Sequence, residues 1–211
     1  MRKLTGAVFM SIDGVMQAPG GPEEDPAGNF QLGGWSFHFW DETLEKPFSK
    51  VIEADYDLLL GKRTYDIFSA YWPNHQDIPV GATFQRINKY VLTHADDPLG
   101  WANSHKIDGD TAKAVAELKR TAGRDLLIQG SSTLYSPLLA AGLIDKLVLM
   151  TFPVVLGGGK SIFDGLQSSG AYKIVESTVT DKGVVFASYE PDGKVPIGSF
   201  ADGEPGDQDA A

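Results

Sequence analysis

Short runs of consecutive apolar residues alternate along this chain with longer segments whose apolar residues have helical spacing. Apolar runs predict strands at 4–10, 56–60, 89–93, 125–129 and 146–155. Helical spacing predicts helices near 42–54, over 62–70, from an N-cap at Asp110 to a C-cap at Gly123, and over about 133–141, with another short helix before 89. This alternation is typical of a mainly parallel sheet covered by helices on its faces, so the sequence predicts an α/β protein.

The C-terminal part of the chain has a different pattern. Segments 171–180 and 184–190 alternate or run apolar around Asp181-Lys182-Gly183, which predicts an antiparallel hairpin that closes the sheet. The residues that follow are rich in Gly, Pro and acidic side chains and offer little to bury. We therefore expect one domain over 1–192 and an acidic tail over 193–211, disordered from about residue 195.

Composition narrows the class of protein. The formal charge of −10 disfavours binding to nucleic acid, and the longest apolar stretches fall far short of the ~20 residues that span a bilayer. The chain contains no cysteine, and its four histidines lack the spacing of metal ligands. We expect a cytoplasmic protein that binds no metal, nucleic acid or membrane.

Two strand ends open directly into helices through small or polar residues. These junctions are Gly61-Lys62-Arg63-Thr64 and Gly130-Ser131-Ser132-Thr133. A helix N-terminus offers unpaired amides and a positive dipole end, and glycine lets a phosphate approach the backbone, so the pair could hold the pyrophosphate of a dinucleotide. The alternative is that the glycines merely end strands and that Lys62 and Arg63 are solvated.

Other familiar motifs fail. Gly157-Gly158-Gly159-Lys160-Ser161 would need a glycine at Val154 to be a phosphate-binding P-loop and a glycine at Ile162 to be a dinucleotide fingerprint. The chain also lacks the G-x-S-x-G signature of many serine hydrolases. Neither an NTPase, a Rossmann cofactor site nor a serine hydrolase is supported.

Motifs in sequence order carry a family resemblance. Ser11-Ile12-Asp13-Gly14, Leu60-Gly61-Lys62-Arg63-Thr64-Tyr65, Gln129-Gly130-Ser131 and the segment 142–159, from Gly142-Leu143-Ile144-Asp145 to Gly157-Gly158-Gly159, resemble the dihydrofolate reductase superfamily over about 4–190. The last two motifs are most similar to the reductase domain of riboflavin biosynthesis. The resemblance implies a three-layer fold like that of dihydrofolate reductase and an NADPH-dependent reductase.

The resemblance also implies roles for residues. Gly61, Lys62, Arg63 and Thr64 would hold phosphates, with Thr93 and His94 near the 2′-phosphate, and Gly130, Ser131, Ser132 and Thr133 would face the pyrophosphate. Candidate catalytic residues are Asp13, Glu45 (with Asp41 and Glu42 nearby) and Thr151, and candidate substrate contacts are Ser11, Asp13, Trp35, Trp40, Pro153 and Leu156. Asp13 could instead simply form a turn, and acids near Glu45 could simply favour a helix start.

An insert at 19–40 departs from both relatives. It begins with a polar stretch rich in Gly and Pro and ends with the aromatics Trp35, Phe37, Phe39 and Trp40. They could form a lid over a flat substrate, a subunit interface or a core staple.

Several functions remain open. The leading hypothesis is a reductase acting on a riboflavin-precursor ribosylamino-pyrimidine or a related heterocycle. The alternatives are a dihydrofolate or pterin reductase, a reductase of an unrelated carbonyl or nitro compound, and a non-catalytic NADPH-binding module. We expect a homodimer, since relatives often pair through the sheet and its hairpin.

Overall fold

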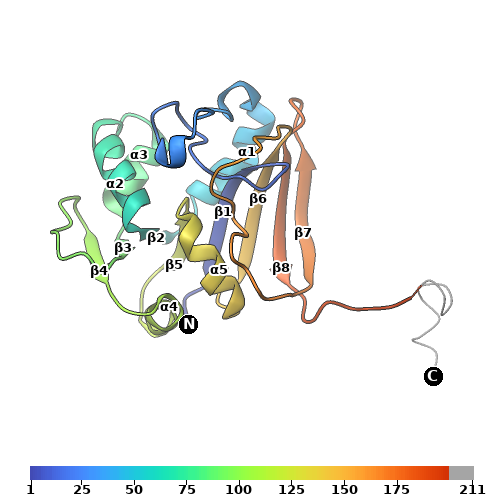
Figure 1. Cartoon of the computed structure of the whole chain (residues 1–211). Coiled ribbons are helices and arrows are strands. Elements are labelled where there is room, and N and C mark those ends of the chain that lie inside the picture. Colours follow the sequence, from blue (N-terminus) through green and yellow to red (C-terminus); the bar gives the residue numbers. More distant parts are fainter. Residues whose placement is uncertain (200–211) are drawn as a thin grey trace.

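The computed structural model describes residues 1–199, which form one twisted sheet with helices on both faces (Figure 1). The strands are β1 (Leu4–Ser11), β2 (Tyr56–Gly61), β3 (Lys89–Leu92), β4 (Ser104–Ile107), β5 (Asp125–Gln129), β6 (Lys146–Phe152), β7 (Tyr172–Val179) and β8 (Val185–Pro191). Their order is β4-β3-β2-β5-β1-β6-β8-β7. The strands from β4 to β6 run parallel, and β8 pairs antiparallel with both β6 and β7. The predicted α/β fold is confirmed, including its C-terminal hairpin.

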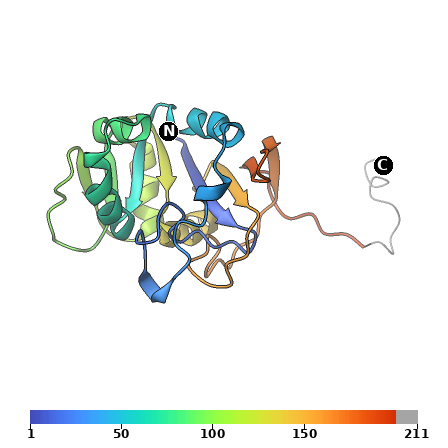
Figure 2. The same ribbon diagram turned by 90° about the horizontal axis from the view of Figure 1, so that it is seen from above.

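Helices cover the two faces of the sheet as separate layers (Figure 2). They are α1 (Glu42–Ile52), α2 (Lys62–Tyr71), α3 (Pro79–Arg86), α4 (Thr111–Arg120) and α5 (Ser132–Ala140), with short 3₁₀ turns at Ala27–Asn29, Phe37–Phe39 and Trp72–Asn74. Side chains alternate across a strand, so Leu58 and Leu60 pack into the core under α1 and α3, whereas Leu59 packs into the core under α4 and α5. The two hydrophobic cores fix the three-layer arrangement.

One strand and two element ends differ from the predictions for identifiable reasons. Strand β4 was not predicted, because its four residues Ser-His-Lys-Ile are mostly polar and lack a buried face. Strand β6 ends at Phe152 because Pro153, which has no amide hydrogen, follows it. Helix α4 ends at a C-cap on Thr121. Gly123 instead lies against the Arg2 guanidinium, because a Cβ on Gly123 would stand 3.1 Å from Arg2 Cζ.

The end of the described chain leaves the sheet. Residues 195–199 form neither helix nor strand and extend away from the domain (Figure 1). Most of the predicted disordered tail, 200–211, lies outside the described residues. Within 1–199, no helix is long and apolar enough to cross a membrane.

Candidate functional site

A cavity of about 360 Å³ opens beside the carboxyl ends of the central strands β1, β2 and β5. This is the edge at which open α/β sheets bind ligands. The wall contains an apolar part built by β1, α1, α2 and the insert, and a polar part built by the two βα junctions. Residues from these elements that line it include Ala7, Phe9, Gln17, Glu24, Asp25, Trp40, Phe48, Gly61, Lys62, Arg63, Thr64, Phe68, Gln129, Gly130, Ser131, Ser132, Thr133 and Lys160.

The two predicted phosphate-binding junctions lie side by side. Strands β2 and β5 are neighbours, and their register pairs Leu59 with Ile128, which leaves both glycines at the same edge. The Gly61 amide donates to Ser131 Oγ at 2.9 Å, and the Ser131 amide donates to Thr64 Oγ1 at 3.0 Å. Each junction thus hydrogen-bonds to the other, and together they form one continuous polar wall.

Both helices that leave these junctions present their first turns to the cavity. Helix α2 starts directly after Gly61 and α5 directly after Ser131, and neither N-cap side chain hydrogen-bonds to its own helix. Positive backbone φ at Gly130 (75°) and Ser131 (58°) turns the chain sharply into α5. Amides at a helix start carry partial positive charge, so this wall favours an anionic ligand.

One polar atom in the wall points to a missing partner. Gln129 Oε1 is buried and has no hydrogen-bond partner among the described residues, and Gln129 lines the cavity. An unpaired buried acceptor costs about 1–3 kcal/mol, which a ligand N–H or O–H would recover. The wall therefore offers amide donors for an anionic group and, at Gln129, one acceptor without a partner among the described residues.

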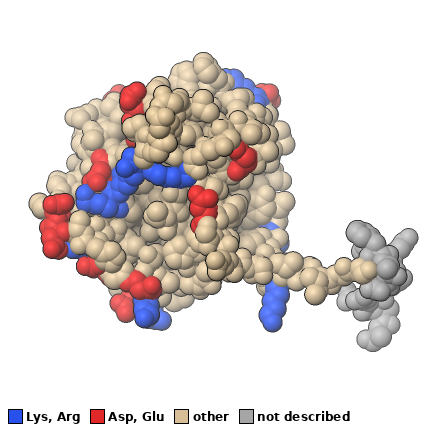
Figure 3. Space-filling view, viewed as in Figure 1, with Lys and Arg blue, Asp and Glu red and all other residues tan. Residues whose placement is uncertain are grey.

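Basic side chains gather across the middle of the face shown in Figure 3, with acidic side chains on both sides. Three cations line the cavity, and each is paired with a carboxylate. Lys62 Nζ lies 2.8 Å from Asp66 Oδ1, while Arg63 and Lys160 bind opposite oxygens of Asp25. A phosphate that enters here must exchange for, or join, these carboxylates.

Thr93 and His94, predicted near a 2′-phosphate, follow β3 at the same edge of the sheet. Leu92 pairs in register with Gly61, so the two residues lie beside the start of α2. Thr93 is buried and its Oγ1 accepts the Ala95 amide at 3.0 Å, whereas the exposed His94 pairs with Asp108. Neither residue lines the cavity, and their role stays a prediction.

The insert forms one side of the cavity and is tied to it by polar contacts. Gln17 Nε2 donates to the carbonyl oxygens of Asp25 and Ala27, and Gln17 Oε1 accepts the Lys160 amide at 3.0 Å. Trp35 Nε1 donates to the Gln17 carbonyl at 2.8 Å. These contacts fix the insert against the loop before Ile162, so that Asp25 reaches Arg63.

Most of the insert's aromatic side chains pack into the core. Trp35 and Phe39 contact Phe152, and Trp40 contacts Phe9 and Phe48 with ring centroids 5.9 and 5.1 Å away. Phe37 is 72% exposed. Three of the four rings therefore serve as a core staple, as one of the alternatives predicted. Of the four, Trp40 is the one that also lines the cavity.

Two adjacent carboxyl groups of the insert face the cavity in opposite surroundings. Burial raises the pKa of Glu24, whose Oε2 accepts the Gly20 amide at 2.6 Å, and the neighbouring Asp25 charge adds to the increase. Burial alone would also raise the pKa of Asp25, but hydrogen bonds from Arg63 and Lys160 lower it overall. Asp25 is thus held ionised, and Glu24 is shifted toward its neutral form.

The predicted catalytic acids lie elsewhere. Asp13 accepts the Ser11 hydroxyl at 2.6 Å and the amides of Gly157 and Leu156, and these bonds lower its pKa to about 2. An exposed, tightly bonded carboxylate of this kind joins two turns. Glu45 is exposed on α1.

Except for Trp40, the remaining predicted catalytic and substrate residues also lie outside the cavity wall. Buried Ser11 holds the turn after β1, and Trp35 packs against Phe152. Thr151, predicted as a catalytic residue, is on β6 next to the lining Met150 and does not itself line the cavity. Pro153 and Leu156 belong to the loop after β6. Of the substrate contacts predicted, Trp40 is the one that lines the cavity.

Sequence reasoning missed five polar residues of the wall: Gln17, Glu24, Asp25, Gln129 and Lys160. The acidic run 23–25 between glycines and prolines was a visible signal in the insert. Lys160 received no role because the glycine motif that contains it failed, although its Nζ donates to Asp25 Oδ2 at the cavity. Only the pairing of distant loops brings these groups together, and a linear motif does not encode it.

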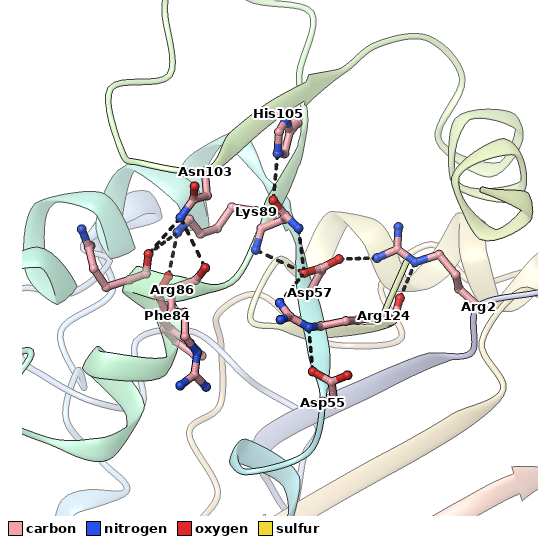
Figure 4. Close-up of polar contacts among 11 residues, drawn as sticks. Arg2, Asp55, Asp57, Phe84, Arg86, Lys89, Asn103, His105 and Arg124 are labelled. Atoms are coloured by element: carbon pink, nitrogen blue, oxygen red, sulfur yellow. Dashed lines mark hydrogen bonds and ion pairs between the residues drawn. The ribbon is translucent and has the colours of Figure 1, made fainter. Parts of the chain in front are cut away.

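A second ionic cluster lies at the opposite edge of the sheet, where the strands begin (Figure 4). Asp57 accepts Arg2 Nη2 at 2.7 Å, both members being 2% exposed, and also faces Arg124. Lys89 is fully buried, donates to the Phe84 carbonyl at 2.7 Å and lies 4.3 Å from the centre of the Trp101 ring. This cluster ties the starts of β1, β2, β3 and β5 together.

Comparison with known proteins identifies the family. The family model of the RibD C-terminal domain matches residues 2–186. Uncharacterized protein YyaP from Bacillus subtilis (strain 168) is 26% identical over 140 residues, which cover 64% of this chain and 74% of that protein.

Solved structures share the fold. A candidate riboflavin biosynthesis protein from Shewanella sp. PV-4 superposes with a TM-score of 0.65 at 21% identity, covering 91% of this chain and 99% of that one. Dihydrofolate reductase from Enterococcus faecalis, in complex with NADP(H), superposes with a TM-score of 0.56 at 17% identity, covering 90% and 96%. The structures show a dihydrofolate-reductase-like fold, and on the evidence of the family model the chain belongs to the RibD C-terminal domain family.

Proposed function

We propose that this protein is an NADPH-dependent reductase that transfers hydride to a ribosylamino-pyrimidine of the kind found in riboflavin biosynthesis. The observation that carries the proposal is the direct hydrogen bonding between the Gly61 and Ser131 junctions beside one cavity. Membership of the RibD C-terminal domain family supports a reductase of this pathway type.

The residues present fit the cofactor. First-turn amides of α2 and α5 would bind the pyrophosphate, with Ser131, Thr133 and Thr64 hydroxyls close by. Lys62 and Arg63 would bind the extra phosphate of NADPH, because a dianion gains most from cationic donors. Gln129 Oε1 would accept a donor from the ligand. When bound, the cofactor supplies the hydride.

The apolar part of the cavity suits a flat ring. Phe9, Trp40 and Phe48 form a packed aromatic group whose members all line the cavity. Aromatic faces bind planar heterocycles and exclude water from the reacting atoms. The chain's own contribution is thus to orient a planar substrate next to the polar wall that grips the phosphates.

The cofactor assignment is tested by binding. We expect Lys62→Ala with Arg63→Ala to weaken NADPH binding about ten- to a hundredfold while NADH binding changes by less than about threefold, because two cation contacts to phosphate are lost. Fluorescence titration with both nucleotides measures this. Lys113→Ala on α4 removes a basic side chain that does not line the cavity and serves as the control. Equal losses for NADPH and NADH would refute the phosphate assignment.

Turnover separates the candidate functions. Oxidation of NADPH, followed by its absorbance, should proceed with the ribosylamino-uracil phosphate and not with dihydrofolate. Turnover of dihydrofolate instead would favour the folate alternative. Tight NADPH binding without oxidation by pyrimidines, pterins, carbonyl or nitro compounds would favour the non-catalytic binding module.

We also propose that two copies of the chain pair through the β7 edge. Every residue of β7 is exposed, including Ile174 at 58% and Val179 at 67%. An exposed apolar edge strand is a template for pairing with another strand. Sedimentation should give a dimer, and Ile174→Lys with Val179→Lys should give a monomer. A wild-type monomer at micromolar concentration would contradict this proposal.

A further inference from the structure

The proposed reductase needs a proton as well as a hydride, and the cavity wall contains two carboxyl groups. Within the described chain, Glu24 and Asp25 are the only acidic residues that line the cavity. Asp25 is bound on both oxygens by Arg63 and Lys160 and is 7% exposed, so it holds no proton to give. Asp13 and Glu45 lie outside the wall. Glu24 is the remaining acid.

On the basis of the proposed function, we infer that the Glu24 carboxyl is the proton donor that completes reduction of the substrate. Glu24 lines the same cavity as the aromatic group Phe9, Trp40 and Phe48, to which the planar substrate is assigned. The Gly20 amide binds Oε2 at 2.6 Å and holds the side chain at the cavity.

The surroundings of Glu24 favour a retained proton. The side chain is partly buried, and burial raises its pKa by more than the hydrogen bonds from the Gly20 and Gly21 amides lower it. Asp25 is the charged group next to it, and its negative charge raises the pKa further. The cations of the same wall are Lys62, Arg63 and Lys160, and each is already paired with Asp66 or Asp25, which reduces their pull on the Glu24 proton.

The step balances as a two-electron reduction. With NADPH held at the two junctions, the cofactor would supply hydride to the carbon of a substrate C=N or C=O group, and the π electron pair would move to the nitrogen or oxygen. That atom takes the proton of the Glu24 carboxyl. NADP⁺ would be the oxidised product, and the Glu24 carboxylate would regain its proton from solvent. Glu24→Gln removes the transferable proton but keeps the size and shape of the side chain.

The test begins without substrate. Carbonyl ¹³C NMR of glutamate-labelled protein, assigned with Glu24→Gln, should give a Glu24 pKa above its usual 4.5, and Asp25→Asn should lower it again, because the neighbouring negative charge is removed. A Glu24 carboxyl that titrates at or below 4.5 overturns the inference whatever the substrate proves to be.

Turnover then tests the role. Glu24→Gln should lower the single-turnover rate of NADPH oxidation about a hundredfold and abolish the loss of rate at alkaline pH, while NADPH affinity stays within about twofold. Glu24→Asp should restore part of the rate. The matched control is Glu23→Gln, an exposed neighbour outside the cavity, which should behave as the wild type. If Glu24→Gln oxidises NADPH as fast as the wild type and still loses rate at alkaline pH, the inference is overturned. If the wild-type protein does not bind NADPH, the proposed function is overturned instead.

Discussion

Asp57 and Asp25 each lie between two cations, and they occupy opposite ends of the sheet. Asp57 faces Arg2 and Arg124 where the strands begin, and Asp25 faces Arg63 and Lys160 where the strands end. Their surroundings differ. Arg2 and Asp57 are each 2% exposed, and Arg124 beside them is 40% exposed, whereas neither cation at Asp25 is buried: Arg63 and Lys160 are 56% and 34% exposed and line a cavity. The same ionic arrangement holds the fold together at one end and prepares a ligand site at the other.

The difference arises from what each group is attached to. Asp57, Arg2 and Arg124 lie in or next to central strands, whose positions are fixed by two hydrophobic cores. Asp25 belongs to the insert, which is held mainly through Gln17 and Trp35. The Arg2–Asp57 pair is closed to solvent and to ligands, whereas Asp25 and its two cations line a cavity that a ligand can enter.

The largest expected effect is at the buried pair. Asp57→Ala leaves the buried Arg2 guanidinium without its carboxylate, so we expect a loss of about 3–5 kcal/mol in the free energy of unfolding. Urea denaturation measures it. Asp55→Ala is the control, since Asp55 pairs with the same Arg124 but is 82% exposed, and it should cost less than about 1 kcal/mol. Equal losses of unfolding free energy in Asp57→Ala and Asp55→Ala would mean that burial of the Asp57 pair does not matter for stability.

The next effect depends on pH and concerns Lys89, in the same buried cluster. Burial lowers the pKa of Lys89 from its usual 10.5 to about 8. Between these values the unfolded chain binds more protons than the folded one, so stability rises with pH in that window. Relative to Lys89→Met, the wild type should gain about 2 kcal/mol between pH 7 and pH 9.5, measured by urea denaturation at each pH. A constant difference would mean that Lys89 titrates normally.

A glycine pair compares the two junctions within the site. Gly130 has a φ of 75°, and a Cβ there would lie 2.9 Å from Thr64 Cγ2, so Gly130→Ala should cost about 1–2 kcal/mol and weaken NADPH binding. Gly61 has a φ of −78°, and its Cβ would meet only Ser131 and Thr133 at ordinary distances of 3.6–3.7 Å. Gly61→Ala should therefore leave stability nearly unchanged. Thermal unfolding and nucleotide titration of both variants measure the two effects. Equal losses of stability in Gly130→Ala and Gly61→Ala would contradict the expected difference between the junctions.

The smallest expected effect is at Asp25. Asp25→Asn keeps the shape of the side chain but releases Arg63 and Lys160 for a phosphate, so NADPH should bind about three- to tenfold more tightly, with stability changed by less than about 1 kcal/mol. Glu23→Gln, which removes an equal charge outside the cavity, should not change the affinity. Weaker NADPH binding by Asp25→Asn would mean that this carboxylate organises the cations instead of competing with the ligand.

The same contrast explains how far the sequence could be interpreted. Runs of apolar residues located the central strands, because these strands bury side chains in both cores, and the glycines at both junctions marked the strand ends that meet. It could not locate β4, whose residues are polar. Nor could it place Asp25 beside Arg63, 38 positions along the chain, because only the folded insert brings them together.

The most direct test of the central claim is an amide NMR titration with NADPH. If the cofactor lies across the paired junctions, the backbone signals of Gly61 to Thr64 and of Gly130 to Thr133 should shift together and saturably, while those of Arg2, Asp57 and Arg124 at the other end of the sheet stay unchanged. Saturable shifts confined to other segments, or an absence of saturable shifts at either junction, would contradict the account.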